Sequence, residues 1–145
     1  LHVAYSTAGF TFAAAAGLES DDTSMSFSGA MGSLNFGIGY ADDDSLNTSY
    51  TSIGLGYTVD NLSLQGLMVN VDANGTKTEN VGLSISYAMN ELTMAAAMSD
   101  TDTANADASY GFGASYDLGG GLSIAGGIGS DAGNSTADLG VNMSF

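Results

Sequence analysis

The last nine residues of the chain alternate strictly between two kinds of side chain. From Ala137 to Phe145 every odd position is apolar and every even position is small or polar. This is the period of a β-strand with one apolar face and one wet face. The same period recurs along the whole chain, in segments of about 8–11 residues. A pattern repeated this often predicts a sheet that has lipid on one side and water on the other.

Eleven such segments follow one another, and short and longer polar connections alternate strictly between them. The predicted strands are residues 1–6, 10–18, 25–31, 34–40, 50–58, 62–71, 81–87, 92–98, 109–116, 122–128 and 137–145. The longer connections are residues 19–23, 41–47, 72–80, 99–108 and 129–135, and the loop 72–80 holds the only lysine, Lys77.

The sixteen acidic residues are sorted toward the longer connections. Thirteen lie in or beside them, and only Asp60, Glu91 and Asp117 lie in the short ones. Outer-membrane barrels have short periplasmic turns and longer external loops, whereas a soluble sandwich has no reason to sort its charge to one end. The sequence therefore predicts an all-β fold, a transmembrane antiparallel β-barrel in the bacterial outer membrane, with residues 1–145 as a single domain.

The alternation also predicts which side chains face lipid. Tyrosines at strand ends are expected to form the aromatic girdles of such barrels. The phase of residues 62–71 stays open, because the two halves of this segment alternate out of step. The predicted outward face holds Val3, Tyr5, Phe10, Phe12, Met25, Phe27, Leu34, Phe36, Ile38, Tyr40, Ile53, Leu55, Tyr57, Val81, Leu83, Ile85, Tyr87, Leu92, Met94, Met98, Tyr110, Phe112, Tyr116, Leu122, Ile124, Ile128, Leu139, Val141, Met143 and Phe145.

The predicted inward face carries only small or polar side chains, and nothing bulky is expected there. A small closed barrel would fill its interior with bulky side chains or ionic networks. The sequence therefore predicts a wide, water-filled lumen. The inward residues include Ser84, Ser86, Thr93, Ser109, Gly111, Gly113, Ser115, Ser123 and Asn142.

Composition excludes several other classes of protein. The net charge is -15, with one Lys and no Arg, so the basic patch that a nucleic-acid binder needs is absent. No Cys is present, which excludes a disulfide framework and a thiolate site. No apolar run approaches the ~20 residues of a membrane-spanning helix. The single histidine, His2, has no catalytic partner at a recognisable spacing, so we expect no enzyme activity and assign no catalytic, cofactor-binding or metal-binding residue.

Two acidic runs offer oxygen ligands of the kind that Ca²⁺ prefers. One is Asp42-Asp43-Asp44, and the other is Asp100-x-Asp102 with Asn105 and Asp107. Neither has the glycine or the closing glutamate of an EF-hand loop, so solvated acidic loops are favoured over a metal site. Crowded acids facing lipopolysaccharide phosphates would still need bridging ions, so we expect no cofactor but a weak dependence on Ca²⁺ or Mg²⁺.

Two segments near the end of the chain carry a specific resemblance. The first is Tyr110-Gly-Phe-Gly-Ala-Ser-Tyr-Asp-Leu-Gly-Gly-Gly-Leu-Ser-Ile-Ala-Gly-Gly-Ile128, and the second is the ending 137–145. Together they closely resemble the C-terminal end of the outer-membrane porins of purple photosynthetic and related alphaproteobacteria. The run Gly-Ala-Ser-Tyr-Asp-Leu-Gly-Gly-Gly is the specific part, whereas many outer-membrane barrels share a terminal Phe.

The resemblance implies a sixteen-stranded, homotrimeric general diffusion porin, embedded in outer-membrane lipid and lipopolysaccharide, whose water-filled channel passes small hydrophilic solutes and ions. It also implies that the terminal aromatic residue helps the assembly machinery to recognise the chain. Family pores usually oppose basic wall residues to acidic ones, but this chain has no Arg. From the acidic vestibule alone we expect a weak preference for cations.

An odd number of strands leaves the predicted sheet open. The first and last of eleven antiparallel strands run in the same direction, so joining them would need a parallel seam, and an open edge in lipid is not viable. We therefore expect the chain to be the C-terminal portion of a longer porin, whose other part would supply the loop that narrows the pore. The alternatives are a secreted or surface all-β structural or adhesive protein, and a small β-barrel membrane anchor with an even strand count.

Overall fold

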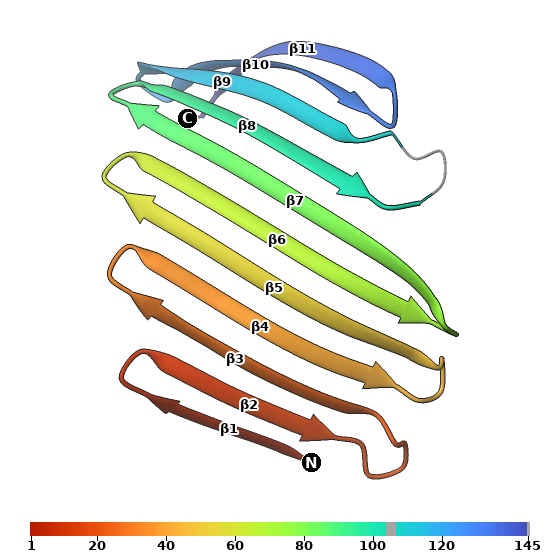
Figure 1. Cartoon of the computed structure of the whole chain (residues 1–145). Helices are drawn as coiled ribbons and strands as arrows, with labels where there is room; N and C mark the ends of the chain where they lie inside the picture. Colours follow the sequence, from red (N-terminus) through yellow and green to blue (C-terminus); the bar gives the residue numbers. More distant parts are fainter. Residues whose placement is uncertain (104–106, 145) are drawn as a thin grey trace.

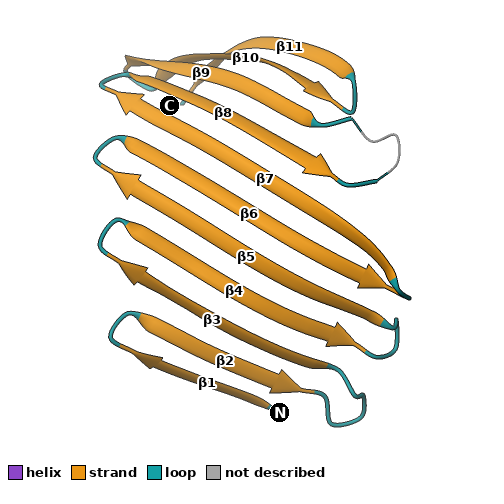
Figure 2. Cartoon of the chain, in the orientation of Figure 1, coloured by secondary structure: helices purple, strands orange, loops and turns teal. Residues whose placement is uncertain are grey.

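Eleven antiparallel strands form one meandering sheet in the computed structural model, which describes residues 1–103 and 107–144. Each strand pairs with its neighbours in sequence, so β1 and β11 are the two edges (Figure 1). The strands are β1 His2–Thr7, β2 Phe10–Ala16, β3 Thr23–Met31, β4 Leu34–Asp43, β5 Thr48–Val59, β6 Leu62–Ala73, β7 Thr76–Met89, β8 Leu92–Thr101, β9 Ser109–Gly119, β10 Leu122–Asp131 and β11 Asn134–Met143. Figure 2 shows strands joined by loops and turns throughout the described chain.

All eleven predicted strands are present, which confirms the all-β expectation. Two predicted loops are wrong, however. Residues 72–80 and 129–135 are the ends of two hairpins, closed by the two-residue turns Asn74-Gly75 and Ala132-Gly133. Both turns have positive φ at both residues, the backbone that best matches the twist of paired strands. The strict alternation of short and long connections therefore does not hold.

The longer connections that remain lie at one end of the sheet. They join β2 to β3, β4 to β5, and β8 to β9, and the last includes residues outside those described. We call this end, where each even-numbered strand meets the next odd-numbered strand, the acidic end. The opposite end has only tight turns, such as Asp60-Asn61. In Figure 1 the acidic end lies on the right.

The register confirms the predicted faces, because residues paired across neighbouring antiparallel strands point to the same side. Every described residue that was predicted to face outward lies on one side, here called the apolar face. Phe145 lies outside the described residues. One row across seven strands illustrates the apolar face: Tyr5, Phe12, Phe27, Ile38, Ile53, Met68 and Val81.

The other side, here called the polar face, holds all nine residues that were predicted to point inward. The open phase of residues 62–71 is settled by pairing: Leu64 pairs with Tyr57 on the apolar face, whereas Leu67 pairs with Gly54 on the polar face. The expectation that nothing bulky points inward is therefore wrong. Pairing with β5 and β7 places Gln65, Leu67, Val69 and Val71 of β6 on the polar face. Tyr50 of β5, which pairs with Val71, lies there as well.

The apolar face packs against no other layer of the described residues. None of the described residues is a buried hydrophobic one, and Leu83, Ile128 and Leu139 are 51%, 66% and 81% exposed. A water-soluble sheet this large would cover such a surface with a second layer. The part of the chain that the structure describes contains no helix long and apolar enough to cross a membrane.

Candidate functional site

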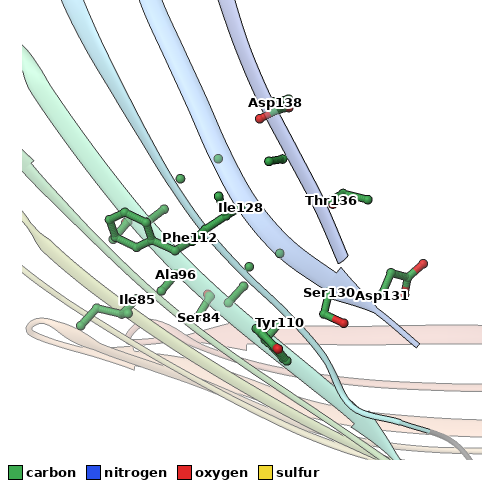
Figure 3. Close-up of a pocket in the computed structure, with 18 of the residues that line it drawn as sticks. Ser84, Ile85, Ala96, Tyr110, Phe112, Ile128, Ser130, Asp131, Thr136 and Asp138 are labelled. Atoms are coloured by element: carbon green, nitrogen blue, oxygen red, sulfur yellow. The ribbon is translucent and has the colours of Figure 1, made fainter. Parts of the chain in front are cut away.

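The polar face is hollowed where β6 to β11 curl. This hollow has a volume of about 660 Å³ and is lined mainly by small residues of the polar face, together with Ile85, Tyr110, Phe112 and Ile128 from the apolar face. Figure 3 shows Ser84 of β7 together with Asp131 of β10 and with Thr136 and Asp138 of β11. The curl brings the polar face of these strands to the concave side. A concave, wet wall is what a water-filled passage requires.

The floor of this hollow is nearly bare of side chains. The row that starts at β11 runs across six further strands and contains only small residues beyond its first member: Asp138, Gly127, Gly113, Ala95, Ser86, Ser63 and Thr58. Such residues keep the lumen wide and leave backbone and hydroxyl groups to meet water. This row agrees with the predicted alternation, whereas other rows of β6 carry Leu67, Val69 and Val71 on the same face.

The polar face carries negative charge and no Lys or Arg. Four acids lie on it: Asp43, Asp117, Asp131 and Asp138. Lys77, the only Lys or Arg in the chain, pairs with Asp72 on the opposite side of the sheet. Lys77 was predicted to lie in a loop, but the structure places it in β7, next to the Asn74-Gly75 turn. The electrostatic potential along this wall is therefore negative.

Twelve of the sixteen acids lie at the acidic end, and Asp60, Glu91 and Asp117 lie at the other. This confirms the predicted sorting except for Asp138, which was counted with the connection 129–135. Because that connection is only a two-residue turn, Asp138 is the fifth of ten residues in β11. The turn Ala132-Gly133 fixes this position, since Asp138 is the fifth residue beyond it.

Side chains link the connections at the acidic end to one another. The backbone N–H of Asp44 donates to Oδ1 of Asp22 at 3.0 Å, which joins the β4–β5 connection to the β2–β3 connection. Nδ2 of Asn47 donates to Oδ1 of Asn74 at 3.0 Å. These bonds run along the acidic end of the sheet, here called the rim, from β2 to β7. The rim is therefore a connected ridge rather than a set of independent loops.

The rim continues at the other side of the curl. Oγ of Ser109 donates to Oδ1 of Asp131 at 2.7 Å, which joins the start of β9 to the end of β10. Asp43 accepts bonds from Oγ of Ser45 and from the backbone N–H of Leu46, at 2.6 and 3.0 Å. Acids of the rim thus accept hydrogen bonds that hold the connections between strands in place.

Aromatic side chains on the apolar face are arranged as predicted. Tyr57 and Tyr87 lie two residues before the ends of β5 and β7 at the tight-turn end, whereas Tyr110 is the second residue of β9 at the acidic end. Tyr40 and Tyr116 lie on the same face, three residues before the ends of their strands. Two levels of tyrosine at opposite ends of the strands match the two interfaces of a bilayer.

No catalytic arrangement was predicted, and His2 lies at the start of β1 on the polar face, opposite Ala15. Among residues 1–103 and 107–144, no three His, Cys, Asp or Glu side chains are grouped so that they could hold a metal ion. Of the two acidic runs that offer oxygen ligands, Asp42-Asp43-Asp44 and Asp100 to Asp107, the second includes Asn105, which lies outside the described residues. In the first run, Asp42 and Asp43 point to opposite faces of the sheet because they are consecutive strand residues.

Known proteins share both sequence and fold with this chain. Residues 1–136 match the family model described as Gram-negative porin. The porin of Fuscovulum blasticum is 34% identical over 94 residues, which are 64% of this chain and 32% of that protein.

Two solved structures have the same fold. A porin refined at 1.8 Å resolution superimposes with a TM-score of 0.73 at 23% identity, covering 99% of this chain and 60% of that one. A multiple mutant of the Rh. blastica porin gives 0.67 at 24% identity, covering 99% and 54%. The chain thus spans between a third and three fifths of the length of these relatives. The extent of the family match and the shared sheet, with its bare apolar face, place the chain in the bacterial outer membrane, and the chain belongs to the Gram-negative porin family.

Proposed function

We propose that this sheet is part of the wall of a water-filled channel for passive diffusion of small hydrophilic solutes and ions. The observation that carries the proposal is the separation of faces: a mainly apolar and a mainly polar surface extend over eleven strands, and a hollow lies over β6 to β11. The relatives named porins support it. The channel is proposed to be non-enzymatic, as the match to the porin family supports.

Liposome swelling tests this function directly. The full-length protein is reconstituted into liposomes, and uptake rates are measured for uncharged sugars of increasing size. A diffusion channel gives rates that fall steeply with solute size and do not saturate with concentration. Saturable uptake of one sugar, or no swelling by any of them from correctly folded protein, would contradict the proposal.

The charge of the wall further indicates a preference for cations. Four acids and no Lys or Arg line the polar face, and a wall of one sign concentrates counter-ions. In planar bilayers with a KCl gradient, the reversal potential should give a K⁺ permeability above that of Cl⁻. A K⁺ permeability equal to or below that of Cl⁻ would contradict this expectation.

The partners of the channel are part of the same proposal. The protein is expected to be a homotrimer in a membrane of lipid and lipopolysaccharide. Support comes from the apolar face, where Phe10, Phe27 and Phe36 form an aromatic cluster with ring centroids 5.7–6.1 Å apart, in which Phe10 and Phe27 are stacked and Phe36 is tilted. Native mass spectrometry of detergent-extracted protein should give three copies per particle.

A weak dependence on Ca²⁺ or Mg²⁺ completes the proposal. Asp42, Asp72, Glu79 and Asp100 lie on the lipid side of the sheet near the acidic end. Lipopolysaccharide phosphates at that level would need divalent ions as bridges. Adding EDTA to protein in lipopolysaccharide-containing bilayers should lower its unfolding temperature, whereas the same treatment in detergent should not.

A further inference from the structure

Asp138 differs from the other acids of this chain in its depth. It has four strand residues on one side and five on the other, which places it roughly 14 Å along the strand from Asn134 at ~3.4 Å per residue. Its sequence neighbour Leu139 is on the apolar face and 81% exposed. Asp138 therefore lies at the level of the hydrocarbon core. A carboxylate at that depth is stable only where it faces water.

On the β10 side, Asp138 carries the one charge among the described residues that surround it. Its partner on β10 is Gly127, and the next residue in the row is Gly113. A Cβ added at Gly127 would lie 3.4 Å from Oδ1 of Asp138, so the carboxylate reaches over the neighbouring strand. The groove around it is lined by Thr93, Ala95, Ser115, Ala125 and Gly140, none of which projects as far or carries charge.

The other three acids of the polar face lie near strand ends and are already engaged. Asp43 accepts two hydrogen bonds within its turn, Asp131 accepts one from Ser109, and Oδ1 of Asp117 accepts the backbone N–H of Gly119 at 2.8 Å. Salt screens charges at the mouth over about 8 Å at physiological ionic strength. At mid-depth an ion passes the wall with lipid behind it, where the same charge acts more strongly.

We propose that Asp138 is the wall residue that sets the preference of this channel for cations over anions. The inference rests on the proposed channel function and assigns its selectivity to one carboxylate. An ion moving along β9 to β11 meets a bare floor and one fixed negative charge at the middle of the membrane. Cations are stabilised there and anions are repelled, whereas the rim acids act mainly on the concentration of ions at the mouth.

Planar-bilayer recordings of the full-length protein test this assignment. The K⁺-to-Cl⁻ permeability ratio is obtained from the reversal potential in a KCl gradient. Asp138→Asn should lower the ratio by about twofold, and Asp138→Glu should preserve it. The matched control is Asp131→Asn, which removes one charge from the same face at the rim and should change the ratio less. An equal or larger effect of the control would overturn the proposal.

A second variant removes any doubt about folding. These 145 residues contain no Cys, so Asp138→Cys introduces their only thiol, and the same reagents applied to the wild type control for thiols elsewhere in the protein. A trimethylammonium methanethiosulfonate adds a positive charge and should shift the ratio toward Cl⁻, whereas a sulfonate reagent should restore the cation preference. Failure of both reagents to alter the ratio in conducting channels would refute the role of Asp138. Absence of conductance in the unmodified wild type would instead refute the channel function itself.

Discussion

Gly29 on β3 lies beneath the ring of Phe10, which stacks on Phe27 at a centroid distance of 6.0 Å. A Cβ at this position would overlap the ring. Gly29→Ala should therefore push Phe10 out of the cluster and lower the free energy of unfolding by about 1–3 kcal/mol. The measurement is the temperature at which the folded protein in detergent loses its β-sheet circular dichroism.

Gly37 provides the matched control for this prediction. It lies on the neighbouring strand β4, and an added Cβ would meet Cβ of Ser28 at an ordinary 3.7 Å. Gly37→Ala should leave the unfolding temperature unchanged or raise it slightly, because alanine loses less chain entropy than glycine. Equal losses in both variants would mean that the aromatic cluster contributes nothing specific.

Gly75 tests backbone conformation without a steric effect. Its φ is +82°, and nothing lies within 4 Å of the position of an added Cβ. Gly75→Ala should cost about 1–2 kcal/mol, because a residue with a Cβ is strained in the left-handed region. Gly82 on β7 is equally open but is not among the glycines with positive φ, so Gly82→Ala should be neutral. Thermal unfolding of the two variants, compared in one detergent, separates turn geometry from loss of a glycine.

At the scale of elements, the hydrogen bonds of Asp22 predict how the rim behaves. Oδ1 accepts the backbone N–H of Asp44, and Oδ2 accepts Oγ of Ser20 at 2.6 Å. Asp22→Ala should free the β2–β3 connection, since each bond contributes about 1 kcal/mol. Limited proteolysis of the folded protein should then cleave residues 17–22 several-fold faster. Asp21→Ala, at the exposed neighbour, is the control, and equal cleavage rates would show that Asp22 does not hold the loop.

The sequence predicted the strands well where apolar and polar residues alternate, and less well where they do not. Thr76 to Asn80 are all polar, so this part of β7 carries no apolar signal, yet the ladder continues through it because the Asn74-Gly75 turn closes the hairpin. In β6, apolar residues occupy both faces from Leu67 onward. There only pairing with β5 and β7 fixes the side on which each residue lies.

The candidate site likewise has residues that the sequence pattern identifies and a feature that only strand pairing reveals. Alternation alone identified Gly111, Gly113 and Ser115 as residues of the polar face. It could not show the depth of Asp138, because depth depends on where the hairpin turns and not on the period of the strand. Pairing of β10 with β11 through Asp131 and Asn134 supplies that information. A local pattern thus gives the face, whereas the height along the wall needs the registration of whole strands.

At the scale of the whole molecule, the open sheet leads to a prediction about its closure. All ten pairings are antiparallel, so the edge strands β1 and β11 run in the same direction. Bacterial single-chain barrels have even numbers of antiparallel strands, and each unpaired backbone group in lipid costs several kcal/mol. We therefore expect the wall to be completed by further strands of the same polypeptide.

The intact mass of the native protein, extracted in detergent and denatured by heat, decides how the wall closes. Further strands in the same chain predict a mass near twice 14.5 kDa or more, since 145 residues account for 14.5 kDa. A mass of 14.5 kDa would contradict this expectation and would require β1 and β11 to pair between separate copies. Crosslinks between cysteines placed at Ala4 and Gly140 would then be intermolecular. In the expected case the same two positions would each border a strand of the remaining polypeptide, and no such crosslink should form.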